Sequence, residues 1–132
     1  QPHMLELASS YVEKLTGERY TLDILGINKG VALINNNGER LELKFWSSGL
    51  ADQVYLSLRL ALAKVFSYQV ESLPIILDDI LVRFDENRQR SALELLAELG
   101  KNQQIWLFTC QRSVYDMAQS IMGIDCHRLS RS

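Results

Sequence analysis

The sequence contains few of the residues that build disulfide frameworks or metal clusters. Its 132 residues include two cysteines and two histidines. Cys110 and Cys126 have no metal-type spacing and suggest no disulfide framework. Because secreted domains of this size often depend on disulfides, we expect a protein of a reducing compartment, the cytoplasm.

Long apolar runs and export signals are also missing. No apolar stretch approaches the roughly 20 residues that cross a bilayer, so we expect no membrane partner. No secretory signal is visible either. Residues 1–4, Gln-Pro-His-Met, have the look of a cloning scar ending at a start codon. We therefore predict one domain over residues 5–132.

The chain further lacks a phosphate-binding loop and an excess of basic residues. No Gly-x-x-x-x-Gly-Lys-Ser/Thr run occurs, and Gly100-Lys101-Asn102 lacks both the upstream glycine and the hydroxyl residue. The formal net charge is -2, so the chain as a whole has no electrostatic attraction for nucleic acid. Any DNA contact would come from a local patch or from protein outside this sequence.

What the sequence does contain predicts an α/β fold in two parts. Helical spacing of apolar residues over 5–15, ended by Gly17, predicts a helix. Alternating residues predict a small antiparallel unit with strands over 20–25, 31–34 and 41–45, joined by an Asn-rich turn that ends at Gly38. The second half predicts a parallel βαβ sheet with flanking helices. Its expected elements are a helix over 48–68, a strand over 73–77 buried on both faces, a helix over 87–99, a strand over 104–108, a helix over 114–122 and a short strand over 124–129.

Two adjacent carboxylates, Asp78 and Asp79, follow the apolar strand of the second half. Ligands of open α/β sheets bind beyond the carboxyl ends of the strands. Two acids at such a place can hold a hydrated Mg²⁺ and orient an attacking water. The alternative is that they only end the strand or cap the next helix.

A Ser-Ser-Gly turn, Ser47 to Gly49, opens the long helix. The free backbone N–H groups of a helix N-terminus favour an anion such as phosphate. A plain capped helix is the alternative, because serine and glycine are common at helix starts.

In order, these features are a Ser-x-Gly turn before a Leu-rich helix, a strand ending in two acids, the Phe84–Arg88 turn, and a strand ending in Thr109. This order resembles the C-terminal half of the ATPase head in the SMC, RecF, RecN and SbcC class of ABC-type ATPases. The run from Leu15 to Tyr20 is similar to one in the YhaN-like, SbcC-related group. The resemblance implies half of a P-loop NTPase head, without the Walker A half.

The resemblance also implies roles for particular residues. Ser47, Ser48 and Gly49 match the signature motif, which contacts the γ-phosphate of ATP held by a second head. Asp78 matches the Walker B residue of the Mg²⁺ shell. Asp79 stands in the position, usually Glu, that polarises the attacking water.

Two further positions match elements of the dimer interface and of the switch. Asp85 lies in the segment that resembles the D-loop, which couples the two ATP sites. Gln111 lies in the segment that resembles the switch, which in that class usually presents a histidine to the γ-phosphate. A glutamine can hydrogen-bond a phosphate but cannot share a proton as histidine does.

In that class the phosphate loop lies in an N-terminal half beyond a long coiled coil, and residues 5–16 would be the base of that coil. We therefore expect ATP and Mg²⁺ to bind in the complete head dimer, and the isolated chain to be inactive. The implied partners are the N-terminal half, a second head, DNA and an SbcD-like phosphoesterase nuclease, in DNA repair or processing. Two alternatives stay open: a non-catalytic dimerisation scaffold, and a metal-dependent phosphodiesterase using Asp78, Asp79 and Asp85.

Overall fold

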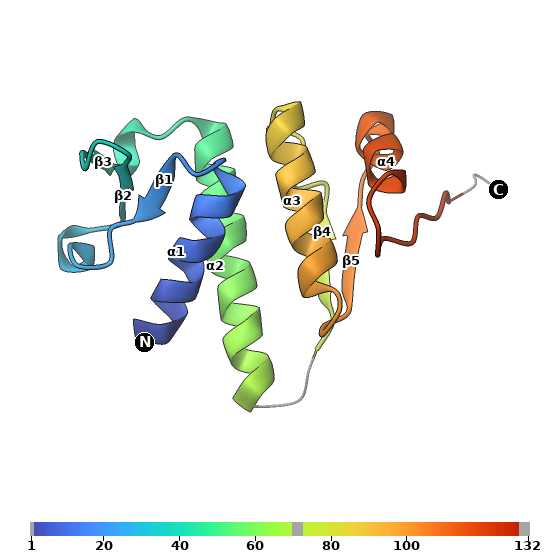
Figure 1. Cartoon of the computed structure of the whole chain (residues 1–132), viewed down its shortest axis with the longest axis horizontal. Helices are drawn as coiled ribbons and strands as arrows, with labels where there is room; N and C mark the ends of the chain where they lie inside the picture. Colours follow the sequence, from blue (N-terminus) through green and yellow to red (C-terminus); the bar gives the residue numbers. More distant parts are fainter. Residues whose placement is uncertain (1, 70–72, 130–132) are drawn as a thin grey trace.

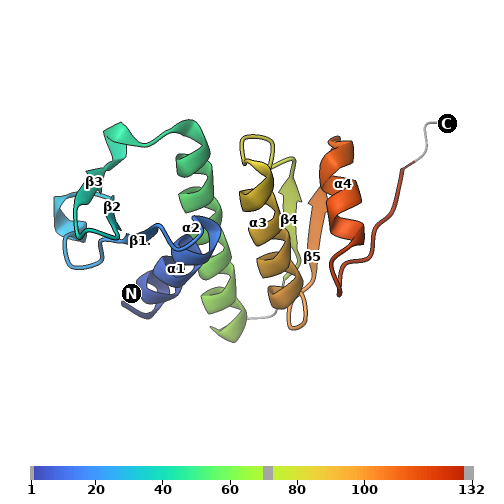
Figure 2. The same cartoon turned by 45° about the horizontal axis from the view of Figure 1, so that its top comes forward.

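The structure is a computed structural model that describes residues 2–69 and 73–129. Along the long axis, a small antiparallel sheet comes first and is followed by helices α1 and α2 (Figure 1). Helix α3, a parallel pair of strands and helix α4 make up the other half. The same order is seen in the turned view of Figure 2. The predicted α/β class, with an antiparallel unit beside a parallel sheet, is confirmed.

The first half consists of helix α1 (Pro2–Leu15) and strands β1 (Tyr20–Leu22), β2 (Ala32–Asn35) and β3 (Arg40–Glu42). The strands are antiparallel in the order β1-β2-β3, with a 3-10 turn, η1 (Ile27–Lys29), between β1 and β2. Helix α1 buries Ala8, Val12 and Leu15 against the long helix α2 (Ser48–Gln69).

The third strand is shorter than the alternating pattern predicted. β3 ends at Glu42, and Leu43–Phe45 form a 3-10 turn, η2. The side chains of Leu43 and Phe45 are exposed, so they do not extend the apolar face of Leu41. Trp46 fixes this turn, because its ring N–H donates to the carbonyl of Leu41 and its backbone N–H to that of Leu43. The chain is thereby directed into α2.

The second half contains strands β4 (Ile75–Asp78) and β5 (Ile105–Phe108), helix α3 (Glu86–Leu99) and helix α4 (Arg112–Gln119). The two strands are parallel, and Asp78 lies opposite Phe108. Ile75 and Leu77 share the hydrophobic core with the apolar face of α3. The prediction of burial on both faces is wrong for this chain, because Ile76, Trp106 and Phe108 on the opposite face are 43–54% exposed.

The C-terminal end also differs from the prediction. α4 ends at Gln119, not at residue 122, because Ser120 and Ile121 close a turn on the carbonyls of Met117 and Ala118. Residues 124–129 form no strand. Among the described residues the parallel sheet consists of β4 and β5, and residues 124–129 pair with neither strand.

None of the helices in the described ranges is long and apolar enough to cross a membrane.

Candidate functional site

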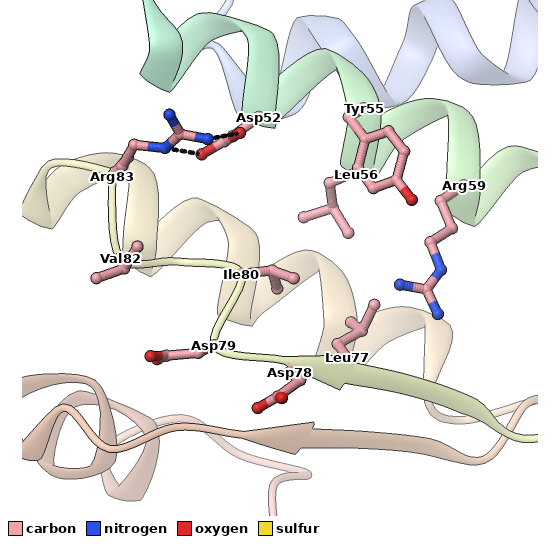
Figure 3. A pocket seen from close by; sticks show the side chains of 10 residues that line it. All are labelled: Asp52, Tyr55, Leu56, Arg59, Leu77, Asp78, Asp79, Ile80, Val82 and Arg83. Atoms are coloured by element: carbon pink, nitrogen blue, oxygen red, sulfur yellow. Dashed lines mark hydrogen bonds and ion pairs between the residues drawn. The ribbon is translucent and has the colours of Figure 1, made fainter.

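The carboxyl end of β4 presents Asp78 and Asp79 in different environments. The parallel ladder continues one residue past the strand, since the Asp79 N–H donates to the Phe108 carbonyl at 2.7 Å. Asp79 then adopts a left-handed backbone with φ of 52°, which is uncommon outside glycine. In Figure 3 both carboxylates point away from helix α2.

Two side chains that follow β5 hold the Asp79 carboxylate. The Thr109 hydroxyl donates to Oδ1 and the Cys110 thiol to Oδ2, each at 3.3 Å. The hydrogen bond to Asp79 and its negative charge raise the pKa of the Cys110 thiol, since both favour the protonated form. Cys110 was not among the predicted site residues. The signal that could have found it is the parallel register, which brings residues 109 and 110 beside residue 79.

Asp78 is the residue best suited to a cation. Its side chain is exposed and makes no hydrogen bond or ion pair with any residue that the structure describes. An exposed carboxylate at a strand end is an ordinary ligand for Mg²⁺, which binds through one or two carboxylates while retaining waters and phosphate oxygens. Within the described ranges, no group of three or more acidic, histidine or cysteine side chains is placed to hold a metal alone.

Asp85 begins helix α3. Its side chain accepts a hydrogen bond from the Arg88 N–H at 2.8 Å and so acts as the N-cap. The turn before it is held from inside, because Leu81 and Phe84 are buried and Gln89 donates to the Leu81 carbonyl. Asp85 is itself exposed, so its position allows contact with another molecule.

The Ser47–Gly49 turn opens helix α2 as predicted. Ser47 caps the helix by accepting the Leu50 N–H at 3.1 Å, whereas the Ser48 side chain is exposed. A Cβ at Gly49 would lie 2.8 Å from the Arg83 carbonyl oxygen, closer than real contacts allow. This turn therefore adjoins the segment that links Asp79 to Asp85.

Gln111 lies beside the carboxylate cluster, directly before α4. Its backbone N–H donates to the Thr109 hydroxyl at 3.1 Å. Its side-chain oxygen Oε1 is buried and has no hydrogen-bond partner among the described residues. A buried acceptor without a donor is costly, so this oxygen is a place where a bound group could supply one.

The predicted residues thus form two groups. Asp78, Asp79 and Gln111 meet at the carboxyl ends of β4 and β5, together with Thr109 and Cys110. Ser47, Ser48 and Gly49 meet the 80–85 turn instead.

Comparison with known proteins identifies the fold. The chain is similar to the uncharacterised protein YhaN of Bacillus subtilis, with 33% identity over 122 residues that cover 90% of the chain. It superposes on the SMC head domain from Thermotoga maritima with a TM-score of 0.69 and 19% identity, covering 89% of this chain and 41% of that one. The chain has the fold of part of an SMC head domain.

Two further SMC heads agree with this assignment. A structure described under ATP-driven dimerisation and DNA-stimulated activation of SMC ATPases gives a TM-score of 0.67 at 15% identity, over 96% of this chain and 78% of that one. An SMC head bound to the C-terminal winged-helix domain of ScpA gives 0.68 at 13% identity, over 89% and 37%. No family model matches the chain.

The resemblance to YhaN-like proteins and to SMC heads, predicted from the order of the motifs, is confirmed. The chain spans only 12% of the length of YhaN and 41% of the T. maritima head. At these identities the likeness to SMC heads establishes the fold alone.

Proposed function

We propose that this chain is the C-terminal lobe of an ATPase head that hydrolyses ATP between two dimerised heads. The observation that carries the proposal is the pair of strand-end carboxylates. The Asp78 side chain is exposed and makes no hydrogen bond or ion pair with the described residues. The neighbouring Asp79 carboxylate accepts hydrogen bonds from Thr109 and Cys110. In an α/β sheet this edge is where ligands bind.

The two carboxylates suit different tasks. Asp78 would be a ligand of Mg²⁺, which when bound supplies neutralisation of phosphate charge. Asp79 would orient the attacking water and accept its proton. Two hydrogen bonds at 3.3 Å fix the direction of its carboxylate, which favours a positioning role over a freely rotating one.

The start of α2 would serve the second head. Ser47 is occupied as the helix cap, but the Ser48 hydroxyl is exposed. The first-turn N–H groups of a 22-residue helix are suited to a phosphate. The structural neighbour described under ATP-driven dimerisation of SMC ATPases supports a second head as the partner.

The open face of the parallel sheet supports a missing N-terminal half. Parallel sheets are ordinarily covered on both faces, and a two-stranded sheet is marginal alone. Here Ile76, Trp106 and Phe108 leave an apolar face exposed. In a Trp46→Phe background, binding of the N-terminal half should shift Trp106 emission to the blue. An unchanged spectrum on association would count against this face as the contact.

DNA, an SbcD-like phosphoesterase nuclease and a cytoplasmic location complete the proposal. One structural neighbour is described as a DNA-stimulated SMC ATPase, which supports DNA as an effector. Cys110 and Cys126 are free thiols, as in most cytoplasmic proteins. The nuclease partner rests on the resemblance to SbcC-like proteins.

The decisive experiment joins this lobe to its N-terminal half through a short linker and measures ATP hydrolysis and dimerisation. We expect both only in the joined protein with ATP and Mg²⁺. Asp79→Asn should keep ATP-dependent dimerisation but lower kcat about 10²–10⁴-fold, the usual contribution of a general base. Wild-type turnover in this variant would remove the role of Asp79.

Ser47→Arg is the matching test of the second head. The long cationic side chain should fill the phosphate position and abolish nucleotide-driven dimerisation. Unchanged dimerisation would refute the signature assignment. Dimerisation of the wild type without turnover would favour a scaffold, and phosphodiester cleavage by the lobe alone would favour the metal-dependent phosphodiesterase.

A further inference from the structure

Arg83 contacts the first turns of helix α2 in two ways. Its guanidinium makes a two-pronged ion pair with Asp52, with Nε to Oδ2 at 2.7 Å and Nη2 to Oδ1 at 2.8 Å. Its backbone carbonyl lies so close to Gly49 that a methyl group there would be at 2.8 Å. The two partners are 31 residues apart in sequence, so this contact joins separate elements of the fold.

Arg83 belongs to the turn that connects the two candidate site residues Asp79 and Asp85. It lies between Asp79, which follows β4, and Asp85, the N-cap of α3. The inner side of the same turn is held by Gln89, which donates to the Leu81 carbonyl. Arg83 holds the outer side to α2, so the turn is fixed from two directions.

Between α2 and the end of β4 lies a hollow of about 230 Å³, and Asp52 and Arg83 belong to its lining. Figure 3 shows how these lining side chains lie. On another side of the hollow, Arg59 of α2 donates to the Ile76 carbonyl at 2.7 Å. Helix α2 is therefore tied to β4 itself by Arg59, and to the segment following Asp79 by the Asp52–Arg83 pair.

We propose that Asp52 and Arg83 are positioning residues that fix the Ser47–Gly49 turn relative to Asp79. This inference rests on the function proposed above, in which the two groups serve two ATP sites of one dimer. Paired N–H donors on a carboxylate impose a defined geometry, whereas a single contact to a lysine would not. Through this clasp, meaning the Asp52–Arg83 ion pair, a displacement of the α2 start is transmitted to the segment that follows Asp79.

The simpler interpretation is a surface ion pair with a small effect on stability. The Arg83 side chain is 57% exposed and that of Asp52 25%, and pairs so exposed contribute little to folding. The chain offers a matched control in the Asp23–Arg40 pair of the antiparallel unit, at 2.8 Å. It joins the same two residue types, through one hydrogen bond instead of two, and belongs to the unit of β1 to β3, away from the strand-end carboxylates.

The test uses the full-length protein with Asp52→Asn, Arg83→Gln, the double variant, Arg83→Lys and the control Asp23→Asn. We expect each of the first two to lower kcat for ATP about tenfold with little change in KM, since a small displacement of reacting groups slows the chemical step. The double variant should match the singles, Arg83→Lys should recover part of the rate, and Asp23→Asn should leave it unchanged. Melting temperatures should stay close to wild type throughout.

Three results would overturn the clasp. They are an unchanged kcat in Asp52→Asn and Arg83→Gln, an equal loss in Asp23→Asn, and a double variant whose loss is the product of the single losses. Asp79→Asn, measured alongside, separates the two proposals. If it abolishes turnover while the clasp variants remain active, only the clasp fails; if the wild-type protein does not hydrolyse ATP, both proposals fail.

Discussion

Replacing Gly17 with alanine should destabilise the chain through two separable effects. Gly17 ends helix α1 with φ of 65°, and a residue with a Cβ pays about 1–2 kcal/mol for that left-handed conformation. The added Cβ would also lie at 2.5 Å from Nη1 and 2.8 Å from Cζ of Arg88. Moving that guanidinium off its preferred rotamer adds about 0.5–1.5 kcal/mol, so the total is about 1.5–3.5 kcal/mol.

Gly38 and Arg88 supply the controls. Gly38 has φ of 79° with open space around it, so Gly38→Ala should show the backbone strain alone, about 1–2 kcal/mol. In an Arg88→Ala background the steric part should vanish, and Gly17→Ala should then cost about as much as Gly38→Ala.

Urea unfolding followed by tryptophan fluorescence measures these free energies, with unfolding treated as two-state. The reasoning is refuted if Gly17→Ala costs no more than Gly38→Ala in the wild-type background. It is refuted equally if removing the Arg88 side chain leaves the excess cost of Gly17→Ala intact.

Two further predictions concern the strand β4 and the residues after β5. Leu77→Ala removes a fully buried side chain and should cost about 2–5 kcal/mol, while Ile76→Ala on the exposed face of the same strand should cost far less; comparison of their urea midpoints checks this. Because Asp79 raises the pKa of Cys110, alkylation of this thiol by iodoacetamide should have a pH midpoint above that of an ordinary cysteine. Asp79→Asn should lower that midpoint and speed labelling at fixed pH, measured by mass spectrometry in a Cys126→Ser background; an unchanged midpoint would mean that the carboxylate does not act on the thiol.

Local patterns predicted the elements well where the deciding contacts are local. The Asn35 side chain accepts the N–H groups of Asn37 and Glu39, so the hairpin turn is encoded within five residues. The predicted length of the third strand was wrong because the strand's end depends on Trp46, whose ring N–H donates to the Leu41 carbonyl. An alternating pattern carries no information about such a contact.

The wrong prediction of a strand buried on both faces has another origin. An unbroken apolar run indicates that both faces of a strand are buried in the complete protein. The residues that cover one face can belong to protein outside this chain. Ile76, exposed by 54% here, is the residue at which those two situations differ. The error is therefore an expected one if further protein covers that face.

Only part of the candidate site could be predicted from the sequence. Ligands bind beyond the carboxyl ends of parallel strands, which is why Asp78 and Asp79 could be predicted as a site from the sequence, whereas Gln111 came only from the family resemblance. The left-handed backbone of Asp79 and the hydrogen bonds that its carboxylate accepts from Thr109 and Cys110 follow from no sequence pattern. The ion pair of Asp52 with Arg83 spans 31 residues and belongs to no motif.

The segment 79–89 connects these observations, because it contacts three helices at successive positions. Arg83 is paired with Asp52 of α2, Asp85 caps α3, and Arg88 packs on Gly17 at the end of α1. The contacts differ in how far they can yield: a Cβ at Gly49 would meet the Arg83 backbone carbonyl, one at Gly17 would meet the movable Arg88 guanidinium, and Asp85 is a helix cap. The α2 start and the end of α1 therefore both contact the segment that directly follows Asp79. Gly17→Ala and Asp52→Asn act on this segment at Arg88 and at Arg83, so, in the ATPase proposed above, their combined effect on kcat measures whether these two contacts are coupled.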